Sequence, residues 1–277
     1  MLIAQVTDLH LHADAGHPNL ARFVRVLEHL ASMLPRPDLL VLSGDLTDDG
    51  ALESYRHLQQ ALAAWPQPVR FALGNHDSRK HFRSVFGDNH FADGFVQGVT
   101  DLGAFRLVIL DSLEEGRHGG AFCEARAQWL HAALRDGGDT PALVFMHHPP
   151  VDVGIPWIDP GPGQAWIGRL DAALQGVSIA GICTGHVHVG GVFPWRGRQV
   201  ATCPSSSSDL SLAFAPMQAA QPDNRPLVEQ GDPAFALHRW QEGGLATIFG
   251  RVPQRVLAHW DEATRQVVGE MLQETRP

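Results

Sequence analysis

Five short clusters of Asp, Asn and His carry the kinds of side chain that bind metal ions. In two of them, an Asp or a His stands two residues before a His. Side chains at that spacing on an extended chain face the same side. Carboxylate, imidazole and amide donors together suit iron, manganese, zinc or cobalt better than copper(I) or an iron–sulfur cluster. The five clusters are Asp8-Leu9-His10, Gly44-Asp45-Leu46-Thr47-Asp48, Gly74-Asn75-His76-Asp77, His147-His148-Pro149-Pro150 and Gly185-His186-Val187-His188.

Each cluster directly follows an apolar segment that reads as a buried strand. Strands alternate with helical periodicity, which predicts a layered α/β fold. Ligand sites in such sheets form beyond the carboxyl ends of the strands, so the clusters are expected to converge. The expected strands are 2–6, 39–42, 69–73, 105–110, 142–146, 177–183 and 199–203, with a hairpin of 235–240 and 245–252 joined at Gly243-Gly244. The expected helices are 20–34, 51–64, 125–134 and 167–174.

The composition argues against a nucleic-acid or membrane protein. The formal charge is −9 and the pI is 5.9, whereas non-specific nucleic-acid binding needs a basic face. The N-terminal segment lacks the features of a signal peptide, and no apolar run is long enough to span a bilayer. Three widely spaced cysteines favour free thiols in a reducing compartment. We therefore expect a cytoplasmic protein, with residues 1–277 forming a single domain.

Taken in order, the clusters match the pattern D-x-H, G-D-x-x-D, G-N-H-D/E, H and G-H-x-H. This run, from Asp8 to His188, resembles the calcineurin-like metallophosphoesterase superfamily. Met146-His147-His148-Pro149-Pro150 and Thr202-Cys203-Pro204-Ser205 make it most similar to class III cyclic-nucleotide phosphodiesterases and bacterial glycerophosphodiesterases. The resemblance implies a four-layer α/β/β/α sandwich with a dinuclear metal site at the carboxyl ends of the strands. It also implies two ligand sets that share Asp45: Asp8, His10, Asp45 and His188 for one ion, and Asp45, Asn75, His147 and His186 for the other.

Three further residues are expected to act near the ions. His76 follows a ligand and would face the substrate, where it could protonate the leaving alkoxide or stabilise phosphate charge. Asp77 would orient His76 through a hydrogen bond, with turn formation as the alternative. His148 would contact substrate or pack within the structure, and Asn75 would lie beside the substrate as well. Asp48 is expected to cap the helix that follows it.

The expected reaction is hydrolysis of a small phosphodiester, such as a cyclic nucleotide or a glycerophosphodiester, by attack of a metal-bridging hydroxide. The alternatives are a phosphomonoesterase or a nuclease on the same centre, and a non-catalytic scaffold of the same fold. No arginine follows Gly44-Asp45 closely, which disfavours a protein phosphatase, and the net charge disfavours a nuclease. The scaffold alternative is disfavoured because the ligand pattern is complete. Residues 205–234, rich in Ser, Pro, Ala and Gln, would form a cap over the site or a contact in a homo-oligomer.

Overall fold

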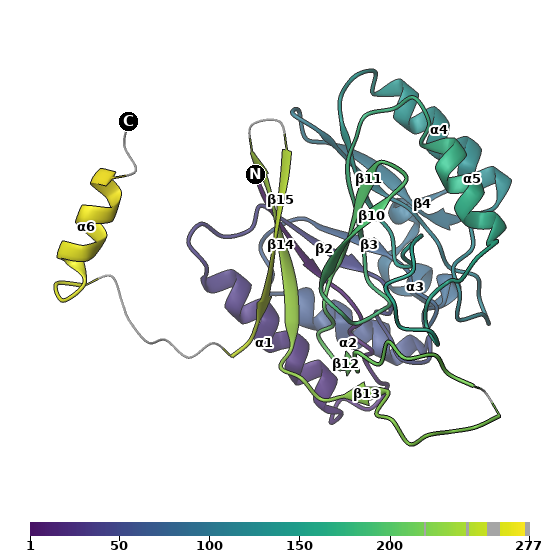
Figure 1. Ribbon diagram of the computed structural model, residues 1–277, viewed down its shortest axis with the longest axis horizontal. Helices are drawn as coiled ribbons and strands as arrows, with labels where there is room; N and C mark the ends of the chain where they lie inside the picture. Colours follow the sequence, from purple (N-terminus) through teal and green to yellow (C-terminus); the bar gives the residue numbers. More distant parts are fainter. Residues whose placement is uncertain (219, 242–243, 254–260, 275–277) are drawn as a thin grey trace.

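Two β-sheets lie face to face at the centre of the molecule in the computed structural model, which describes residues 1–218, 220–241, 244–253 and 261–274 (Figure 1). The first sheet has five strands. Its three strands β1, β2 and β3 pair in parallel, and the hairpin of β14 and β15 adds to β1 in antiparallel orientation. In spatial order its strands are β15 (Gly244–Arg251), β14 (Ala234–Gln241), β1 (Leu2–Val6), β2 (Leu39–Ser43) and β3 (Val69–Ala72).

The second sheet has six strands. Four of them, β11, β9, β8 and β7, pair in parallel, and each edge of this group is extended by one antiparallel neighbour. In spatial order the strands are β10 (Gly191–Trp195), β11 (Arg198–Thr202), β9 (Ile179–Thr184), β8 (Ala142–Phe145), β7 (Arg106–Ile109) and β6 (Gly98–Asp101). Two small ribbons join β4 (Phe91–Ala92) to β5 (Phe95–Val96) and β12 (Asp209–Leu210) to β13 (Val228–Glu229).

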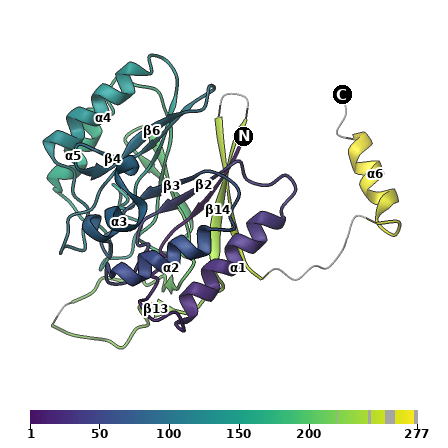
Figure 2. The same cartoon turned by 180° about the vertical axis from the view of Figure 1, so that it is seen from behind.

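Helices cover the outer face of each sheet. Figures 1 and 2 show α1 and α2 on one side of the sheets and α4 and α5 on the other. The α-helices are α1 (Pro18–Ser32), α2 (Leu52–Leu62), α3 (Arg79–Phe86), α4 (Glu124–Asp136), α5 (Ala165–Ala173) and α6 (Arg265–Glu274), and a 3-10 turn, η1, spans Asp88–His90.

Three apolar clusters divide the interior into layers. Alternate side chains of a strand point to opposite faces, so Ala4 and Val6 of β1 pack against α1, α2 and α3, while Ile3 points to the second sheet. Phe145 of β8 meets Ile3 in the cluster between the sheets, and Val144 packs outward against α4 and α5. The order of layers is therefore helix, sheet, sheet, helix, which confirms the expected α/β/β/α sandwich.

The expected strands and helices are all present within a few residues, except that part of the hairpin turn, residues 242–243, lies outside the described residues. The structure adds elements that the sequence did not suggest, chiefly α3, β6 and β10. Helix α6 lies apart from both sheets in the two views, so the single domain over residues 1–277 stays a prediction. None of the described helices combines the length and apolar character that a bilayer span requires.

Candidate metal centre

The seven predicted ligands follow the carboxyl ends of strands in both sheets, and their backbone is unusual. Asp8, His10, Asp45, His186 and His188 all have positive φ, between 43° and 71°. Residues other than glycine avoid this left-handed region because the Cβ atom crowds the following carbonyl, at about 1–2 kcal/mol per residue. Strained backbone of this kind concentrates at functional sites, where the surrounding structure holds it in place.

Two glycines allow the ligand loops to approach one another closely. A Cβ atom on Gly74 would lie 2.3 Å from Oδ1 of Asp45, and one on Gly44 would lie 2.3 Å from Nδ1 of His147. Gly44 also has a φ of +103°, which side chains rarely permit. Glycine is therefore required at both positions if the Asp45 and His147 side chains are to meet.

The first ligand set brings three donor atoms together. Nε2 of His188 lies 3.4 Å from Oδ1 of Asp8 and 3.3 Å from Nε2 of His10. Nε2 of His10 also lies 3.7 Å from Oδ2 of Asp45. Two imidazole nitrogens at this separation, both beside carboxylates, have the arrangement of donors that share one cation.

The second ligand set also meets Asp45, at the same carboxylate oxygen. Nε2 of His147 is 3.2 Å from Oδ2 of Asp45 and 3.8 Å from Oδ1 of Asp8. Within the described part of the chain, Oδ1 of Asn75 is buried without a hydrogen-bond partner, and so is Nε2 of His147, because its contact with Asp45 does not have the geometry of a hydrogen bond. Buried polar atoms of a native protein nearly always have a partner, so these two orphaned donors fit a metal ion as the missing one. The backbone N–H of His186 donates to the Asp8 carboxylate, at 3.1 Å to each oxygen.

Hydrogen bonds to backbone carbonyls fix how the ligand rings are protonated. Nδ1 of His147 lies 2.9 Å from the Ser43 carbonyl oxygen, and Nδ1 of His188 lies 2.8 Å from that of Ser208. A carbonyl can only accept, so Nδ1 must carry the proton in both rings. In the neutral ring Nε2 then holds the lone pair that can bind a metal ion. A hydrogen bond from the other ring nitrogen to a carbonyl is the contact that metal-binding histidines usually make.

The charge balance of the site also calls for cations. Asp8 and Asp45 are buried, and burial alone would raise their pKa values. The positive charges of His188 and His147 lower the pKa of Asp8, and those of His147 and His10 lower the pKa of Asp45. These effects outweigh burial, so both pKa values lie below the ordinary value. Two buried carboxylates in the ionised form are costly unless positive charge compensates them. This donor set therefore fits a pair of metal ions.

Asp48 connects a predicted ligand to His76 and does not cap α2 as expected. Its Oδ1 lies 3.1 Å from Nδ1 of His10, and its backbone carbonyl lies 2.6 Å from Nδ1 of His76. Helix α2 instead begins after Ala51, which makes no side-chain capping bond. The prediction failed because the carboxylate has a stronger partner in the His10 ring, which lies across the site and far away in sequence.

Asp77 lies behind the site and does not touch the His76 ring. Its carboxylate accepts hydrogen bonds from the backbone N–H of Gly74 (2.9 Å), Leu46 (3.1 Å) and Thr47 (3.2 Å), from the Thr47 hydroxyl (3.2 Å) and from the Tyr55 hydroxyl (2.9 Å). Burial and the charge of Asp45 raise its pKa to about 6. The expectation that Asp77 orients His76 is wrong, and the observed contacts join the loop after β2 to the loop after β3.

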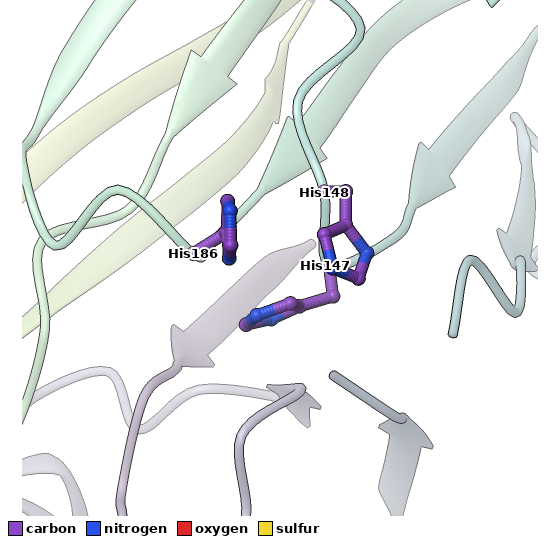
Figure 3. Close-up of side chains that lie close together, drawn as sticks. All are labelled: His147, His148 and His186. Atoms are coloured by element: carbon purple, nitrogen blue, oxygen red, sulfur yellow. The ribbon is translucent and has the colours of Figure 1, made fainter. Parts of the chain in front are cut away.

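His148 and His186 complete a group of three rings with His147 (Figure 3). The centre of the His148 ring lies 4.8 Å from that of His147 and 4.6 Å from that of His186. Its Nδ1 lies 2.9 Å from the Ser112 hydroxyl, while its Nε2 is buried without a partner among the described residues. Burial, followed by the charges of His186 and His147, lowers the pKa of His148 well below its usual value, so the ring is neutral.

A cavity of about 1020 Å³ opens above these residues. Seven predicted site residues line it: His10, Asp45, Asn75, His76, His148, His186 and His188. Asp8, His147 and Asp77 are buried behind this lining. His118 also faces the cavity, with its ring centre 6.5 Å from that of His76, although it carried no signal in the sequence because it stands in a glycine-flanked loop away from any motif.

Two segments far apart in the sequence also line the cavity. Trp157, Asp159, Gln164 and Trp166 precede or begin α5, and Leu210, Val228, Glu229 and Gln230 belong to or adjoin the β12–β13 ribbon. The excursion 205–234 thus contributes part of the cavity wall.

Comparisons with known proteins place this site in a family. The family model for calcineurin-like phosphoesterases matches residues 1–190. The chain is 28% identical to the probable glycerophosphodiester phosphodiesterase GpdQ of Arcobacter nitrofigilis, over 89% of this chain and 92% of that protein. It is 32% identical to the 3',5'-cyclic adenosine monophosphate phosphodiesterase CpdA of Pseudomonas aeruginosa, over 68% of this chain and 70% of that protein.

Solved structures share the fold at much lower sequence identity. A dimetal phosphatase from Danio rerio superimposes with a TM-score of 0.62 at 16% identity, over 90% of this chain and 98% of that chain. The family model covers the strands that carry all seven predicted ligands, from Asp8 to His188. Five of these ligands line the cavity, and Asp8 and His147 are buried behind it. The chain belongs to the calcineurin-like phosphoesterase family.

Proposed function

We propose that this protein hydrolyses small phosphodiesters with the help of two bound metal ions. The observation that supports this most directly is the convergence of donor side chains from both sheets on Asp45, at the floor of a cavity large enough for a small organic substrate. The names of the GpdQ and CpdA relatives favour a diester over a monoester. The proposed ligands are Asp8, His10, Asp45 and His188 for one ion, and Asp45, Asn75, His147 and His186 for the other.

The residues of the chain would then divide the work as follows. When bound, the two ions lower the pKa of coordinated water and stabilise negative charge on the phosphoryl oxygens. Nδ1 of His76 is held by the Asp48 carbonyl, which leaves Nε2 as its free ring atom in the cavity wall. Because a carbonyl only accepts, Nδ1 already carries a proton, so Nε2 would donate to the leaving alkoxide from the doubly protonated ring, which becomes neutral in that step. Asn75 and His148 would contact the substrate phosphate, and Asp77 keeps the two ligand loops together.

The identity of the ions is proposed from the donor chemistry. Two carboxylates, one amide and four imidazoles suit iron, manganese, zinc or cobalt. Elemental analysis of the purified protein tests this directly: about two equivalents of one or two of these elements are expected. Retention of none of them, after growth in a medium that contains all four, would contradict the assignment.

A substrate panel with Mn²⁺ present tests the reaction itself. It compares an aryl phosphodiester, an aryl phosphomonoester, cyclic nucleotides and glycerophosphodiesters. We expect diester hydrolysis that Asn75→Ala reduces strongly, because this change removes a ligand whose Oδ1 has no other partner among the described residues. Greater activity on the monoester than on every diester would overturn the proposal.

The cellular compartment of the enzyme is also a proposal. Three free thiols, Cys123, Cys183 and Cys203, suit a reducing compartment such as the cytoplasm.

The excursion 205–234 would act as a cap, since Leu210, Val228, Glu229 and Gln230 line the cavity. Its exposed apolar side chains Leu212, Phe214 and Met217 are where contact within a homo-oligomer would occur.

A further inference from the structure

The lining residues from the loop before α5 and from the β12–β13 ribbon, here called the outer wall of the cavity, carry charge of one sign. Asp159 and Glu229 contribute carboxylates there, whereas no lysine or arginine is found among the described residues that line the cavity. Asp48 also lines the cavity, but its carboxylate contacts the rings of His10 at 3.1 Å and His12 at 3.6 Å. Once two cations neutralise Asp8 and Asp45, Asp159 and Glu229 would be the lining carboxylates without an ion-pair partner in the described part of the chain, and a bound substrate would meet their charge.

Glu229 is uncompensated for a structural reason. It lies on β13 directly opposite Asp209 of β12, and it is exposed. The nearby Arg251 is committed to Asp209, with bonds of 3.0 Å from Nη1 to Oδ2 and 3.0 Å from Nη2 to Oδ1. No ion pair within the described part of the chain involves Glu229, so its charge is available to the cavity.

Asp159 is held in a fixed position by its own loop. Its two oxygens accept from the backbone N–H groups of Val153 (2.7 Å) and Gly154 (3.0 Å), which closes the loop before α5. In the same loop Trp157 lines the cavity with 39% of its surface exposed. An indole face beside carboxylates is a surface that accommodates neutral or cationic groups well, because the ring is attractive to cations.

We infer that Glu229 and Asp159 make this wall select substrates by charge, and this inference rests on the proposed phosphodiesterase function. The preferred substrates are phosphodiesters whose phosphate is the sole anionic group and whose substituent is neutral or cationic. A substrate that carries a second anion, such as a carboxylate or a terminal phosphate, is repelled. Specificity of this kind comes from an unfavourable interaction with the wrong substrate as much as from a favourable one with the right substrate.

A matched set of chromogenic diesters tests this selection. Three p-nitrophenyl phosphodiesters share one leaving group and differ in the second alcohol: choline, its neutral isostere 3,3-dimethylbutanol, and an ω-hydroxy carboxylic acid of similar length. For each of them, kcat/KM is measured at low ionic strength with Mn²⁺ present. We expect the choline ester to be hydrolysed at least as well as the neutral ester. The anionic ester should be about three- to fivefold worse, the effect expected of one partly exposed charge pair.

Variants of Glu229 assign the effect to this wall. Glu229→Gln should raise the ratio of anionic to neutral kcat/KM about threefold, and Glu229→Lys should raise it further. Glu28→Gln removes an exposed carboxylate of α1 that does not line the cavity, and it should leave the ratio unchanged. The preference should also shrink as salt is added, because exposed charges are screened.

The outcomes separate the inference from the proposed function. If none of the three diesters is hydrolysed by the metal-loaded protein, the proposed function fails. If all three are hydrolysed with equal kcat/KM, or if Glu229→Lys leaves the ratio unchanged, charge selection by this wall is refuted while the phosphodiesterase proposal stands.

Discussion

Asp77→Asn separates a structural role for this buried carboxylate from a catalytic one. Oδ1 of Asp77 faces three donors, the Thr47 N–H and the hydroxyls of Thr47 and Tyr55, and Oδ2 faces the N–H groups of Gly74 and Leu46. An asparagine amide offers one accepting oxygen and one NH₂ group. The better orientation puts the NH₂ group in the place of Oδ1, because the two hydroxyls can turn to accept from it. The Thr47 N–H cannot turn, so it loses its acceptor and faces another donor.

The expected loss of stability follows from this count. An unsatisfied buried donor costs about 1–3 kcal/mol, and the remaining bonds weaken because their acceptor is no longer charged. We therefore expect Asp77→Asn to lower the free energy of unfolding by about 3 kcal/mol, measured by urea denaturation at pH 8. Tyr55→Phe, which removes one donor and leaves the Ser78 N–H without its 2.8 Å acceptor, should cost about half as much.

Metal content and activity decide between the two roles. Asp77 joins the loops of Asp45 and Asn75, so Asp77→Asn should also reduce the metal retained after dialysis. The reasoning is refuted if the variant unfolds within about 0.5 kcal/mol of the parent, retains its metal, and loses activity to the same extent as a His76 variant. That result would show that Asp77 acts on the substrate through His76.

Three further predictions concern catalysis, metal removal and acid stability. His76→Ala should lower kcat by roughly 10²–10⁴-fold, while elemental analysis finds the metal content unchanged. Chelation should lower the thermal midpoint in calorimetry, since ligands that bind only the folded state stabilise it, by about 2.7 kcal/mol at 100 times their Kd. Burial lowers the pKa of His238 to about 3, below the 6.5 of the unfolded chain. The unfolded state therefore binds more protons, and stability present above pH 6.5 is lost toward pH 3, by about 2 kcal/mol between pH 7 and pH 5. Denaturation of His238→Gln at both pH values should show a correspondingly smaller loss.

The ligand loops could be predicted from sequence because each stands beside a strong local signal. Asp8, Asp45 and His147 directly follow apolar strands, and a strand end fixes where the next residues lie in an α/β sheet. The same alternation predicts a layered α/β fold, whereas the order of the four layers was an implication of the family resemblance. Helix α3 was not predicted because it is only 8 residues long, which is shorter than the stretch over which apolar periodicity can be recognised.

The roles of polar residues between the loops could not be predicted in the same way. Asp48 was expected to cap a helix and instead contacts the ring of His10. Asp77 was expected to orient His76 or to form a turn; it forms the turn through Gly74 and also binds the loop after β2. The cavity wall is harder still to predict, since Trp157 and Glu229 are 72 positions apart and no motif links them. Which carboxylate finds which donor is decided by packing, and a single sequence does not encode that locally.

The ligand loops stay in place because the first sheet continues into them. Beyond the ends of β1 and β2, the N–H groups of Asp8, His10 and Leu11 donate to the carbonyls of Gly44 (3.0 Å), Asp45 (3.0 Å) and Leu46 (3.2 Å) in turn. These bonds extend the parallel pairing as far as the bridge between Leu11 and Thr47. The left-handed backbone of Asp8, His10 and Asp45 is therefore held by a ladder of backbone hydrogen bonds. Donors held in this way are already in place before an ion arrives, so little reorganisation opposes binding.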